Sequence, residues 1–227
     1  MKAVVLLSGG LDSTVCMSVA AAAGYEIYPL SFRYGQRHSR ELDCAQQVSA
    51  FYQVKKHLIV DTNMQDIGGS ALTDPSIAVP KGDVTRDDIP VTYVPARNLI
   101  FLSYAVGYAE VLDAEAVYIG VNAMDYSGYP DCRPEFIAKF QELANFATKA
   151  TTTGKKIQVL TPLQFLSKKE IVVLGTKNKA PLALTTSCYN GEAEACGECD
   201  SCLLRLKGFA EAGMNDPIPY KKRGAHF

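Results

Sequence analysis

Apolar runs along the chain alternate with longer stretches of helical periodicity. Residues 2–7 form a short, continuous Val/Leu-rich run, typical of a strand buried on both faces of a parallel sheet. Residues 13–23 have a helix-favouring composition and end at Gly24, a residue type common just beyond the last turn of a helix. The same alternation predicts further strands at residues 25–32, 56–61, 116–121 and 157–160, and further helices at residues 39–52, 97–112, 134–148 and 167–178.

Strands that alternate with helices predict an α/β fold, with an open, mostly parallel sheet covered by helices on both faces. Such sheets bind ligands at the carboxyl ends of their strands, so we expect functional residues directly after strands. We expect one α/β domain over residues 1–180 and a small cysteine-rich segment over residues 181–227. Residues 62–90 are rich in Gly, Pro, Asp and Ser, which indicates a long loop, either a functional lid or a solvated insertion.

The composition is that of a globular protein without an extended charged surface. The chain of 227 residues is 48% hydrophobic and 21% charged, which excludes a disordered protein. Its 23 Lys and Arg residues against 24 Asp and Glu residues give a net charge of -1, so we expect no nucleic-acid or membrane partner. The first apolar run is too short for a signal peptide, and no membrane-length apolar stretch follows, so we expect a cytoplasmic protein.

The loop after the first strand has the composition of an anion-binding site. Its sequence, Ser-Gly-Gly-Leu-Asp-Ser at residues 8–13, lets the backbone turn tightly and opens a helix whose first amides attract an anion. Asp12 is unexpected there, unless Mg²⁺ bridges its carboxylate to phosphates. The alternative is a plain strand-to-helix turn with Asp12 or Ser13 as the helix cap. The candidate ATP-binding residues are Ser8, Gly9, Gly10, Leu11, Asp12, Ser13 and Thr14.

Four of the seven cysteines are clustered near the end of the chain. The spacing of Cys196, Cys199 and Cys202, with Cys188 upstream, suits a tetrahedral, structural Zn²⁺ site that leaves no open position. An iron–sulfur cluster uses similar spacing, although the proline that often follows the last cysteine is replaced here by Leu203. Four free thiols are the third possibility.

Polar and aromatic residues follow the other predicted strands. Arg97 lies in the first turn of a helix, where its charge opposes the helix dipole, so an anionic ligand would relieve the conflict. Cys132 is a candidate nucleophile, but no histidine lies near it in sequence. The candidate substrate-binding residues are Arg33, Tyr34 and Gln36 after the second strand, next to His38, and Tyr129, Asp131, Arg133 and Phe136 after the fourth.

Residues 8–13 resemble the PP-loop of the ATP pyrophosphatase superfamily, whose members split ATP between its α and β phosphates. The remaining motifs narrow the resemblance to the QueC family and cover nearly the whole chain. They are Arg-Tyr-Gly-Gln-Arg-His from residue 33, Val-Pro-Ala-Arg-Asn from residue 94, Ser-Gly-Tyr-Pro-Asp-Cys-Arg-Pro-Glu-Phe from residue 127, and Cys-Gly-Glu-Cys-Asp-Ser-Cys from residue 196 with Arg205 and Phe209.

The resemblance implies an adenine nucleotide alpha hydrolase-like fold and an ATP-dependent ligase of queuosine biosynthesis. Members of the family convert 7-carboxy-7-deazaguanine and ammonia to 7-cyano-7-deazaguanine through adenylated intermediates, and the resemblance suggests a homodimer. Applied to this sequence, it makes Asp12, Ser13 and Arg97 the catalytic residues, with Mg²⁺ accompanying ATP and structural Zn²⁺ on the four clustered cysteines.

Two other functions fit parts of the pattern. A tRNA sulfur-transferring PP-loop protein would need a basic RNA-binding face and catalytic cysteines. A zinc-dependent nucleic-acid-binding regulator would bind DNA with a strong salt dependence and would not need ATP. The near-neutral charge argues against both.

Overall fold

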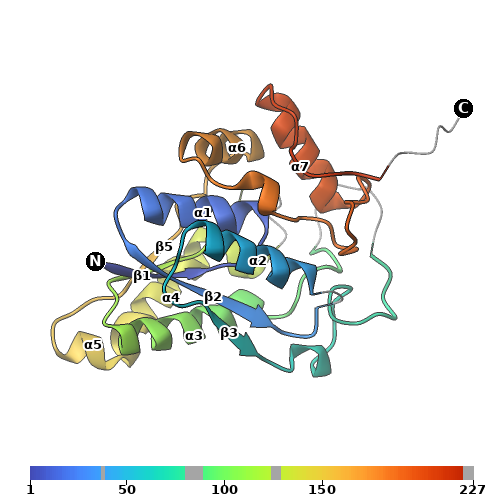
Figure 1. Ribbon diagram of the computed structural model, residues 1–227. Coiled ribbons are helices and arrows are strands. Elements are labelled where there is room, and N and C mark those ends of the chain that lie inside the picture. The colour runs from blue at the N-terminus through green and yellow to red at the C-terminus, as the bar shows by residue number, and fades with distance from the viewer. Residues whose placement is uncertain (37–38, 80–88, 124–128, 222–227) are drawn as a thin grey trace, which may run out of the picture.

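The computed structural model describes residues 1–36, 39–79, 89–123 and 129–221. Five parallel strands form one sheet in the order β3-β2-β1-β4-β5, with β1 at its centre (Figure 1). The predicted α/β fold with a parallel sheet is therefore confirmed. The strands are β1 (Lys2–Leu6), β2 (Glu26–Arg33), β3 (Leu58–Asp61), β4 (Ala116–Tyr118) and β5 (Gln158–Leu160).

Helices cover both faces of the sheet, as Figure 1 shows. On one face lie α1, α2 and α6, with α7 beside α6, and on the other lie α3 and α4. The α-helices are α1 (Leu11–Ala22), α2 (Arg40–Phe51), α3 (Arg97–Leu112), α4 (Pro134–Ala147), α5 (Lys149–Thr152), α6 (Lys168–Lys177) and α7 (Asp200–Glu211), and short 3-10 helices span Met64–Asp66, Pro130–Cys132 and Leu182–Leu184.

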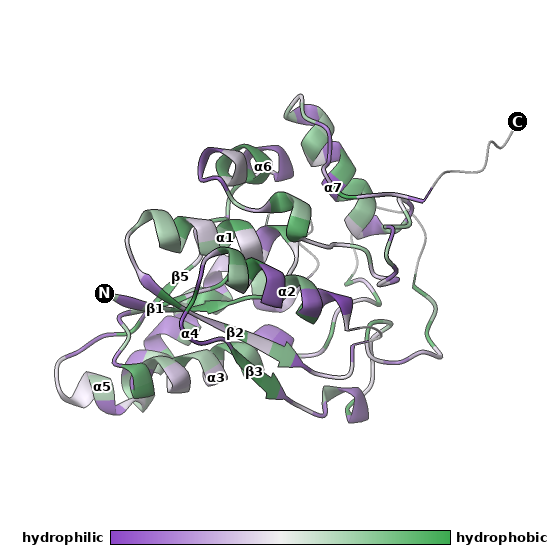
Figure 2. Cartoon of the chain, viewed as in Figure 1, coloured by the Kyte–Doolittle hydropathy of each residue, from purple (hydrophilic) through white to green (hydrophobic). Residues whose placement is uncertain are grey.

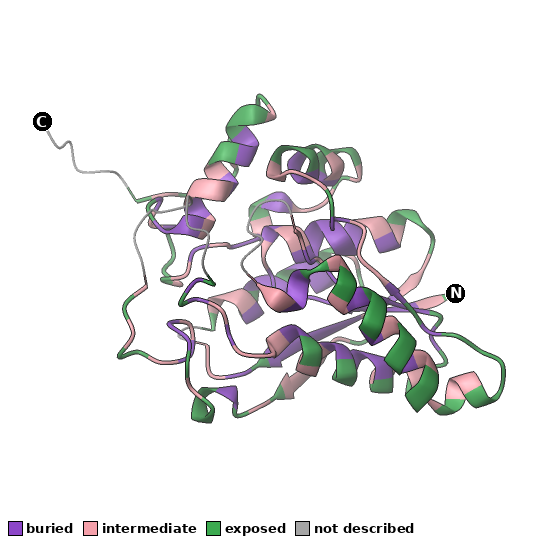
Figure 3. Cartoon of the chain, turned by 180° about the vertical axis from the view of Figure 1, so that it is seen from behind, coloured by how far each residue is buried: buried purple, intermediate pink, exposed green. Residues whose placement is uncertain are grey.

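The side chains of the central strand alternate between two hydrophobic cores. Val4 and Leu6 pack toward α3 and α4, whereas Ala3, Val5 and Leu7 pack toward α1 and α6. Figure 2 shows green, apolar residues along the central strands, and Figure 3 shows much of the sheet in the purple of buried residues, beneath helices with exposed outer faces. Both faces of β1 are therefore buried in hydrophobic cores, which explains its continuous apolar sequence.

Most predicted elements lie within a few residues of the observed ones. The helix predicted at residues 97–112 is α3 itself, and α6 begins with the predicted capping box, in which Ser167 and Glu170 each accept from the other's backbone amide. The strand predicted at residues 116–121 is shorter, because β4 ends at Tyr118 and the chain then turns into a cavity wall. The sequence analysis did not predict α5 or α7.

The cysteine-rich segment packs directly on the α/β core. Phe209 of α7 is buried in the same hydrophobic cluster as α1, and Gly208 lies against the side chain of Lys168. A Cβ atom at Gly208 would come within 2.4 Å of Lys168 Cγ, so α6 and α7 approach closely at this glycine. The division of the chain at residue 180 stays a prediction.

Several sequence predictions fall on residues outside the described ranges. These are His38, residues 80–88 of the long loop, and the first two residues of the Ser-Gly-Tyr-Pro motif. The described part of the long loop contains the 3-10 helix Met64–Asp66. Within the described ranges, no helix is long and apolar enough to cross a membrane.

Candidate functional site

A cavity of about 330 Å³ opens at the carboxyl ends of β1, β2 and β4. Parallel α/β sheets commonly bind ligands at this edge. The cavity wall includes nine of the candidate residues from the sequence, namely Ser8, Gly10, Leu11, Asp12, Ser13, Tyr34, Gln36, Arg97 and Tyr129. The structure therefore brings together residues from four separate sequence motifs.

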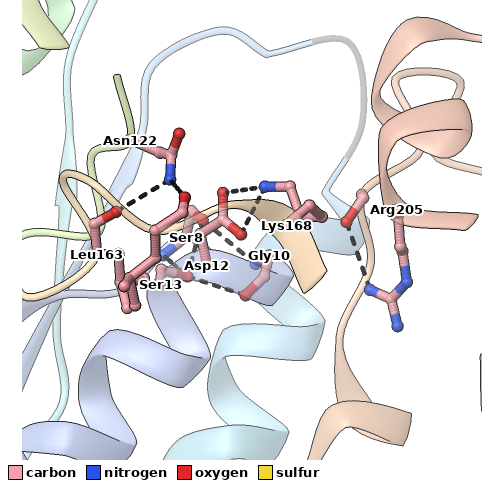
Figure 4. Close-up of polar contacts among 10 residues, drawn as sticks. Ser8, Gly10, Asp12, Ser13, Asn122, Leu163, Lys168 and Arg205 are labelled. Carbon is pink, nitrogen blue, oxygen red and sulfur yellow. Dashed lines mark hydrogen bonds and ion pairs between the residues drawn. The ribbon is translucent and has the colours of Figure 1, made fainter. Parts of the chain in front are cut away.

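The loop after β1 is held by a small network of its own hydroxyl groups. The Ser8 and Ser13 hydroxyl oxygens lie 3.0 Å apart, the Gly10 amide donates to Ser8 Oγ at 3.2 Å, and Ser13 Oγ donates to the Gly10 carbonyl at 3.1 Å (Figure 4). The helix α1 begins at Leu11 without a side-chain cap, so its first turn at the cavity wall suits an anion.

Gly9 lies behind this loop in a position that only glycine fits. Its φ of 84° is left-handed, and a Cβ atom would lie 2.1 Å from the Glu41 carbonyl oxygen and 2.7 Å from the Ala45 nitrogen. The Gly9 carbonyl accepts a hydrogen bond of 3.0 Å from the Thr186 amide. The loop is thus held between α2 and a segment near the end of the chain.

Thr14, the last candidate of the loop motif, does not line the cavity. Its side chain is fully buried within α1, and its hydroxyl has no hydrogen-bond partner among the described residues. Its assignment to ATP binding stays a prediction.

Asp12 forms an ion pair with Lys168, the first residue of α6. The Lys168 ammonium lies 2.9 and 2.8 Å from the two carboxylate oxygens, and only 13% of the Lys168 side chain is exposed (Figure 4). Lys168 was not among the residues predicted from the sequence. The signal that identified Arg97, a cation in the first turn of a helix, also applies to Lys168. Both residues line the cavity, as does Arg205, so three cationic side chains lie at its described wall.

Arg97 keeps its positive charge in a half-buried position. Its Nη1 donates to the Tyr34 hydroxyl at 3.4 Å, and its guanidinium lies 5.9 Å from the Tyr34 ring centre. Burial alone would lower the pKa of Arg97, but Tyr34, Tyr129 and Asp131 together hold it above its ordinary value. The residue can therefore attract an anionic group into the cavity.

Aromatic and apolar side chains form another part of the wall. Phe32 and Phe101 stack with ring centres 3.8 Å apart, and Tyr34 meets Phe101 edge-on at 5.5 Å. The Tyr129 hydroxyl lies 2.8 Å from the Thr92 hydroxyl, so this ring is held in place at the wall. Such a surface suits a planar heterocycle.

Asp131 does not line the cavity but supports the start of α3. Its carboxylate accepts from the Asn98 amide at 2.9 Å, and burial raises its pKa. Cys132 lines the cavity, and its Sγ accepts from the side-chain Nδ2 of Asn98 at 3.3 Å. Burial, with a contribution from Asp131, raises the pKa of Cys132 to about 12, so the thiol stays protonated and is a poor nucleophile.

Three further candidate residues also lie away from the cavity wall. Arg33 is exposed and pairs with Asp61 on the neighbouring strand. Arg133 is exposed at the start of α4, and Phe136, in the first turn of α4, packs against the hydrophobic core. The substrate contacts assigned to these residues, and to Asp131, stay predictions.

The four clustered cysteines converge as metal ligands do. Their sulfur atoms all lie within 4.8 Å of one another, and those of Cys196 and Cys202 are 3.9 Å apart. Tetrahedral Zn–S bonds of about 2.3 Å would separate sulfurs by about 3.8 Å, so this pair fits one ion. The Cys196 amide donates to Cys188 Sγ at 3.3 Å, and donation from Cys199 and Cys202 lowers the Cys188 pKa. The group can hold a metal ion.

Comparisons with known proteins agree with this geometry. The family model "Queuosine biosynthesis protein QueC" matches residues 2–213. A protein of Acetivibrio thermocellus named 7-cyano-7-deazaguanine synthase is 63% identical over 98% of this chain and 99% of that protein. A protein of Desulfitobacterium hafniense named 7-cyano-7-deazaguanine synthase 2 is 61% identical over 98% of this chain and 94% of that protein.

A solved structure described as NMN synthetase from Francisella tularensis has the same fold. Its TM-score is 0.50 at 16% identity, over 94% of this chain and 78% of that chain. At this identity the similarity supports the fold alone.

We predict that Gly9→Ala destabilises the protein far more than Gly24→Ala, as measured by urea unfolding. Both glycines have a positive φ, but a Cβ at Gly24 would meet no atom within 4 Å, whereas one at Gly9 would overlap the α2 backbone. We expect Gly24→Ala to cost about 1 kcal/mol from the left-handed conformation alone and Gly9→Ala at least about 3 kcal/mol. Equal losses would mean that the loop is not confined by α2.

Proposed function

Since the chain belongs to the QueC family of queuosine biosynthesis proteins, we propose that it joins ammonia to 7-carboxy-7-deazaguanine at the expense of ATP and releases 7-cyano-7-deazaguanine. The observation that carries this proposal is the cavity itself. It combines a loop suited to an anion, the cationic side chains of Arg97 and Lys168, and an aromatic wall within one space. Relatives above 60% identity that are named 7-cyano-7-deazaguanine synthases support the product.

The reaction requires two dehydrations and no change of oxidation state. In the first half, the substrate carboxylate attacks the α phosphorus of ATP, pyrophosphate leaves, and ammonia then displaces AMP from the acyl adenylate to give an amide. In the second half, the amide oxygen attacks another ATP and a second pyrophosphate leaves. Loss of AMP and a proton then leaves the nitrile. Each nitrile therefore accounts for two AMP and two pyrophosphate.

We assign the triphosphate to the loop at residues 8–13 and the first turn of α1. The loop hydroxyls and the uncapped helix start offer hydrogen-bond donors, and Lys168 adds positive charge at the same wall. Asp12 would hold the Mg²⁺ that accompanies ATP, because this ion prefers oxygen ligands and the Asp12 carboxylate lies at the cavity wall. Bound there, the ion would neutralise phosphate charge.

We assign Arg97 to the substrate carboxylate of the first half-reaction or to the phosphates, where negative charge develops as pyrophosphate leaves. Its retained charge and its position between the Tyr34 ring and the cavity support this role. Tyr34, Gln36 and Tyr129 would contact the deazaguanine ring system. A carboxylate that accepts from the amidine edge of the base would come from Glu41 or Asp200, because both line the cavity and Asp131 does not.

We propose that the four clustered cysteines bind structural Zn²⁺. Four protein ligands leave no open position for substrate, and the sulfur separation of 3.9 Å matches tetrahedral coordination. Such an ion would stabilise the segment between Cys188 and α7, which has only a small hydrophobic cluster of its own.

The proposal also includes a cytoplasmic homodimer whose subunits each form the two parts expected from the sequence, residues 1–180 and 181–227. Exposed apolar side chains on α3 and α4, including Val111, Leu143 and Phe146, are available to a dimer interface.

We predict that the purified protein, given 7-carboxy-7-deazaguanine, ammonium and MgATP, forms 7-cyano-7-deazaguanine with AMP and pyrophosphate in a 2:1 ratio to the nitrile. Mass spectrometry identifies the product, and chromatography counts AMP. Omission of ammonium should abolish the nitrile. A product that stops at the amide, or release of ADP in place of AMP, would contradict the proposed mechanism.

We predict that Arg97→Met lowers kcat/KM by about 10²-fold or more, as expected when a charge that stabilises the transition state is lost. The matched variant Arg33→Met should remain within about threefold of the wild type, because Arg33 is exposed and paired with Asp61 away from the cavity. Steady-state AMP release measures both. A larger loss of kcat/KM in Arg33→Met than in Arg97→Met would instead assign the anion-binding role to Arg33.

We predict that Cys199→Ser lowers bound zinc well below the roughly one ion per chain expected of the wild type and lowers the melting temperature. Cys44→Ser is the control, since Cys44 is also buried but lies on α2, outside the sulfur cluster. Elemental analysis and thermal unfolding give the two measurements. Iron in place of zinc, or full metal content in Cys199→Ser, would overturn the assignment.

A further inference from the structure

Arg205 is a fully buried cation at the cavity wall, only 1% exposed. It lies on α7, one turn after Cys202. Its Nε and Nη2 donate to the two carboxylate oxygens of Asp216 at 2.7 and 2.9 Å, so its charge is balanced by a buried partner. The Asp216 carboxylate also accepts from the Tyr220 hydroxyl at 2.6 Å. Arg205 is therefore fixed from the C-terminal side.

The other side of the guanidinium holds the segment that precedes Cys188. Nη1 donates to Thr185 Oγ1 at 2.7 Å and to Ser187 Oγ at 3.4 Å, and Nη2 donates to the Leu182 carbonyl at 3.3 Å. Figure 4 shows Arg205 on the far side of Lys168 from the loop residues, and both Arg205 and Asn122 line the cavity. The guanidinium thus donates hydrogen bonds to protein groups on both sides and joins two segments of the chain, an arrangement that we call the Arg205 brace. An arginine that binds phosphate would instead direct its donors at the ligand.

The braced segment makes direct contact with the phosphate-binding loop. The Thr186 amide donates to the Gly9 carbonyl at 3.0 Å, and Thr186 and Ser187 both line the cavity. The next residue, Cys188, is one of the four converging cysteines. Residues 185–188 thus make three contacts. Thr185 bonds to Arg205, Thr186 bonds to the loop, and Cys188 belongs to the sulfur cluster.

Backbone hydrogen bonds also link the cysteine cluster to the segment that follows Asp216. The Ala195 amide donates to the Pro219 carbonyl at 2.9 Å, and the Lys221 amide donates to the Ala195 carbonyl at 2.9 Å. Ala195 precedes the ligand Cys196, and Tyr220 lies between Pro219 and Lys221 and bonds to Asp216. The cluster, Asp216 and Arg205 therefore form a continuous set of hydrogen-bonded contacts that ends at Gly9.

We propose that Arg205 is a positioning residue that couples metal binding at the four cysteines to nucleotide binding at the loop. With the cluster closed on its ion, Arg205 holds Thr185, and the neighbouring Thr186 amide fixes the carbonyl of Gly9. Loss of the ion or of the brace frees residues 185–188 and loosens the loop. The inference rests on the proposed function, since it concerns the affinity of the loop for MgATP.

The test is Thr185→Val, which removes the hydroxyl that Arg205 contacts and keeps the shape and burial of the side chain. The matched control is Thr176→Val on α6, whose hydroxyl bonds its own helix at Val172. We expect the dissociation constant of MgATP, measured by calorimetry, to rise about tenfold in Thr185→Val and not in Thr176→Val. We expect KM for MgATP to rise with it, while kcat at saturating MgATP stays within about twofold. A merely structural role would lower the melting temperature and leave MgATP affinity unchanged.

A second experiment uses the wild-type protein and changes only its metal content. The metal is stripped with a chelator under reducing conditions, the chelator is removed by gel filtration, and MgATP is then titrated. Circular dichroism establishes that the α/β domain is still folded. We expect weakened MgATP binding that returns when Zn²⁺ is restored. Arg205→Lys keeps the charge opposite Asp216 but cannot reach both sides, so it should behave as Thr185→Val does.

The outcomes separate this inference from the proposed function. If the wild type does not bind MgATP, the proposed function fails. If the wild type binds MgATP and both Thr185→Val and the metal-stripped protein bind it equally well, the proposed function stands and the coupling through Arg205 is overturned.

Discussion

The confinement of Gly9 is the constraint on which the site depends. The glycine has no room for a Cβ atom against the backbone of α2, and its carbonyl is held by the Thr186 amide. The loop therefore cannot shift toward α2 without overlap, or away from Thr186 without breaking this hydrogen bond. This fixes the start of α1, and with it the uncapped first turn at the cavity wall. Preorganised donors of this kind lose little entropy when an anion binds.

The site gathers positive charges that are unfavourable on their own. Arg97 begins α3 and Lys168 begins α6, so each opposes the positive end of its own helix. Asp12 offsets one of them, and the hydroxyl of Tyr34 stabilises the other. A triphosphate would offset the charges of both cations at once. The cost of these conflicts in the folded protein is thus consistent with a site shaped for a highly charged anion.

The strands and most helices could be predicted because their apolar patterns are local. The loop motif and the four cysteines could also be predicted, since their spacing is readable in the sequence. The helix α7 was missed because its N-cap Cys199 and the Cys202 of its first turn were interpreted only as parts of the cysteine motif. Lys168 was missed because its partner Asp12 lies far away in sequence, and only the fold brings them together. The bond from the Asn98 backbone amide to Asp131 could not be predicted, because a turn residue does not reveal its orientation from the sequence; the assignment of Asp131 to the substrate stays a prediction.

The hydrogen bond from Thr186 to Gly9 joins one of the first loops of the chain to one of its last segments. During synthesis on the ribosome, the glycine loop is therefore made long before the amide that holds its carbonyl. A nascent chain that has not yet reached Thr186 would carry the loop motif without this support. The loop can take its final position only after residues 182–188 have been added and have folded against it.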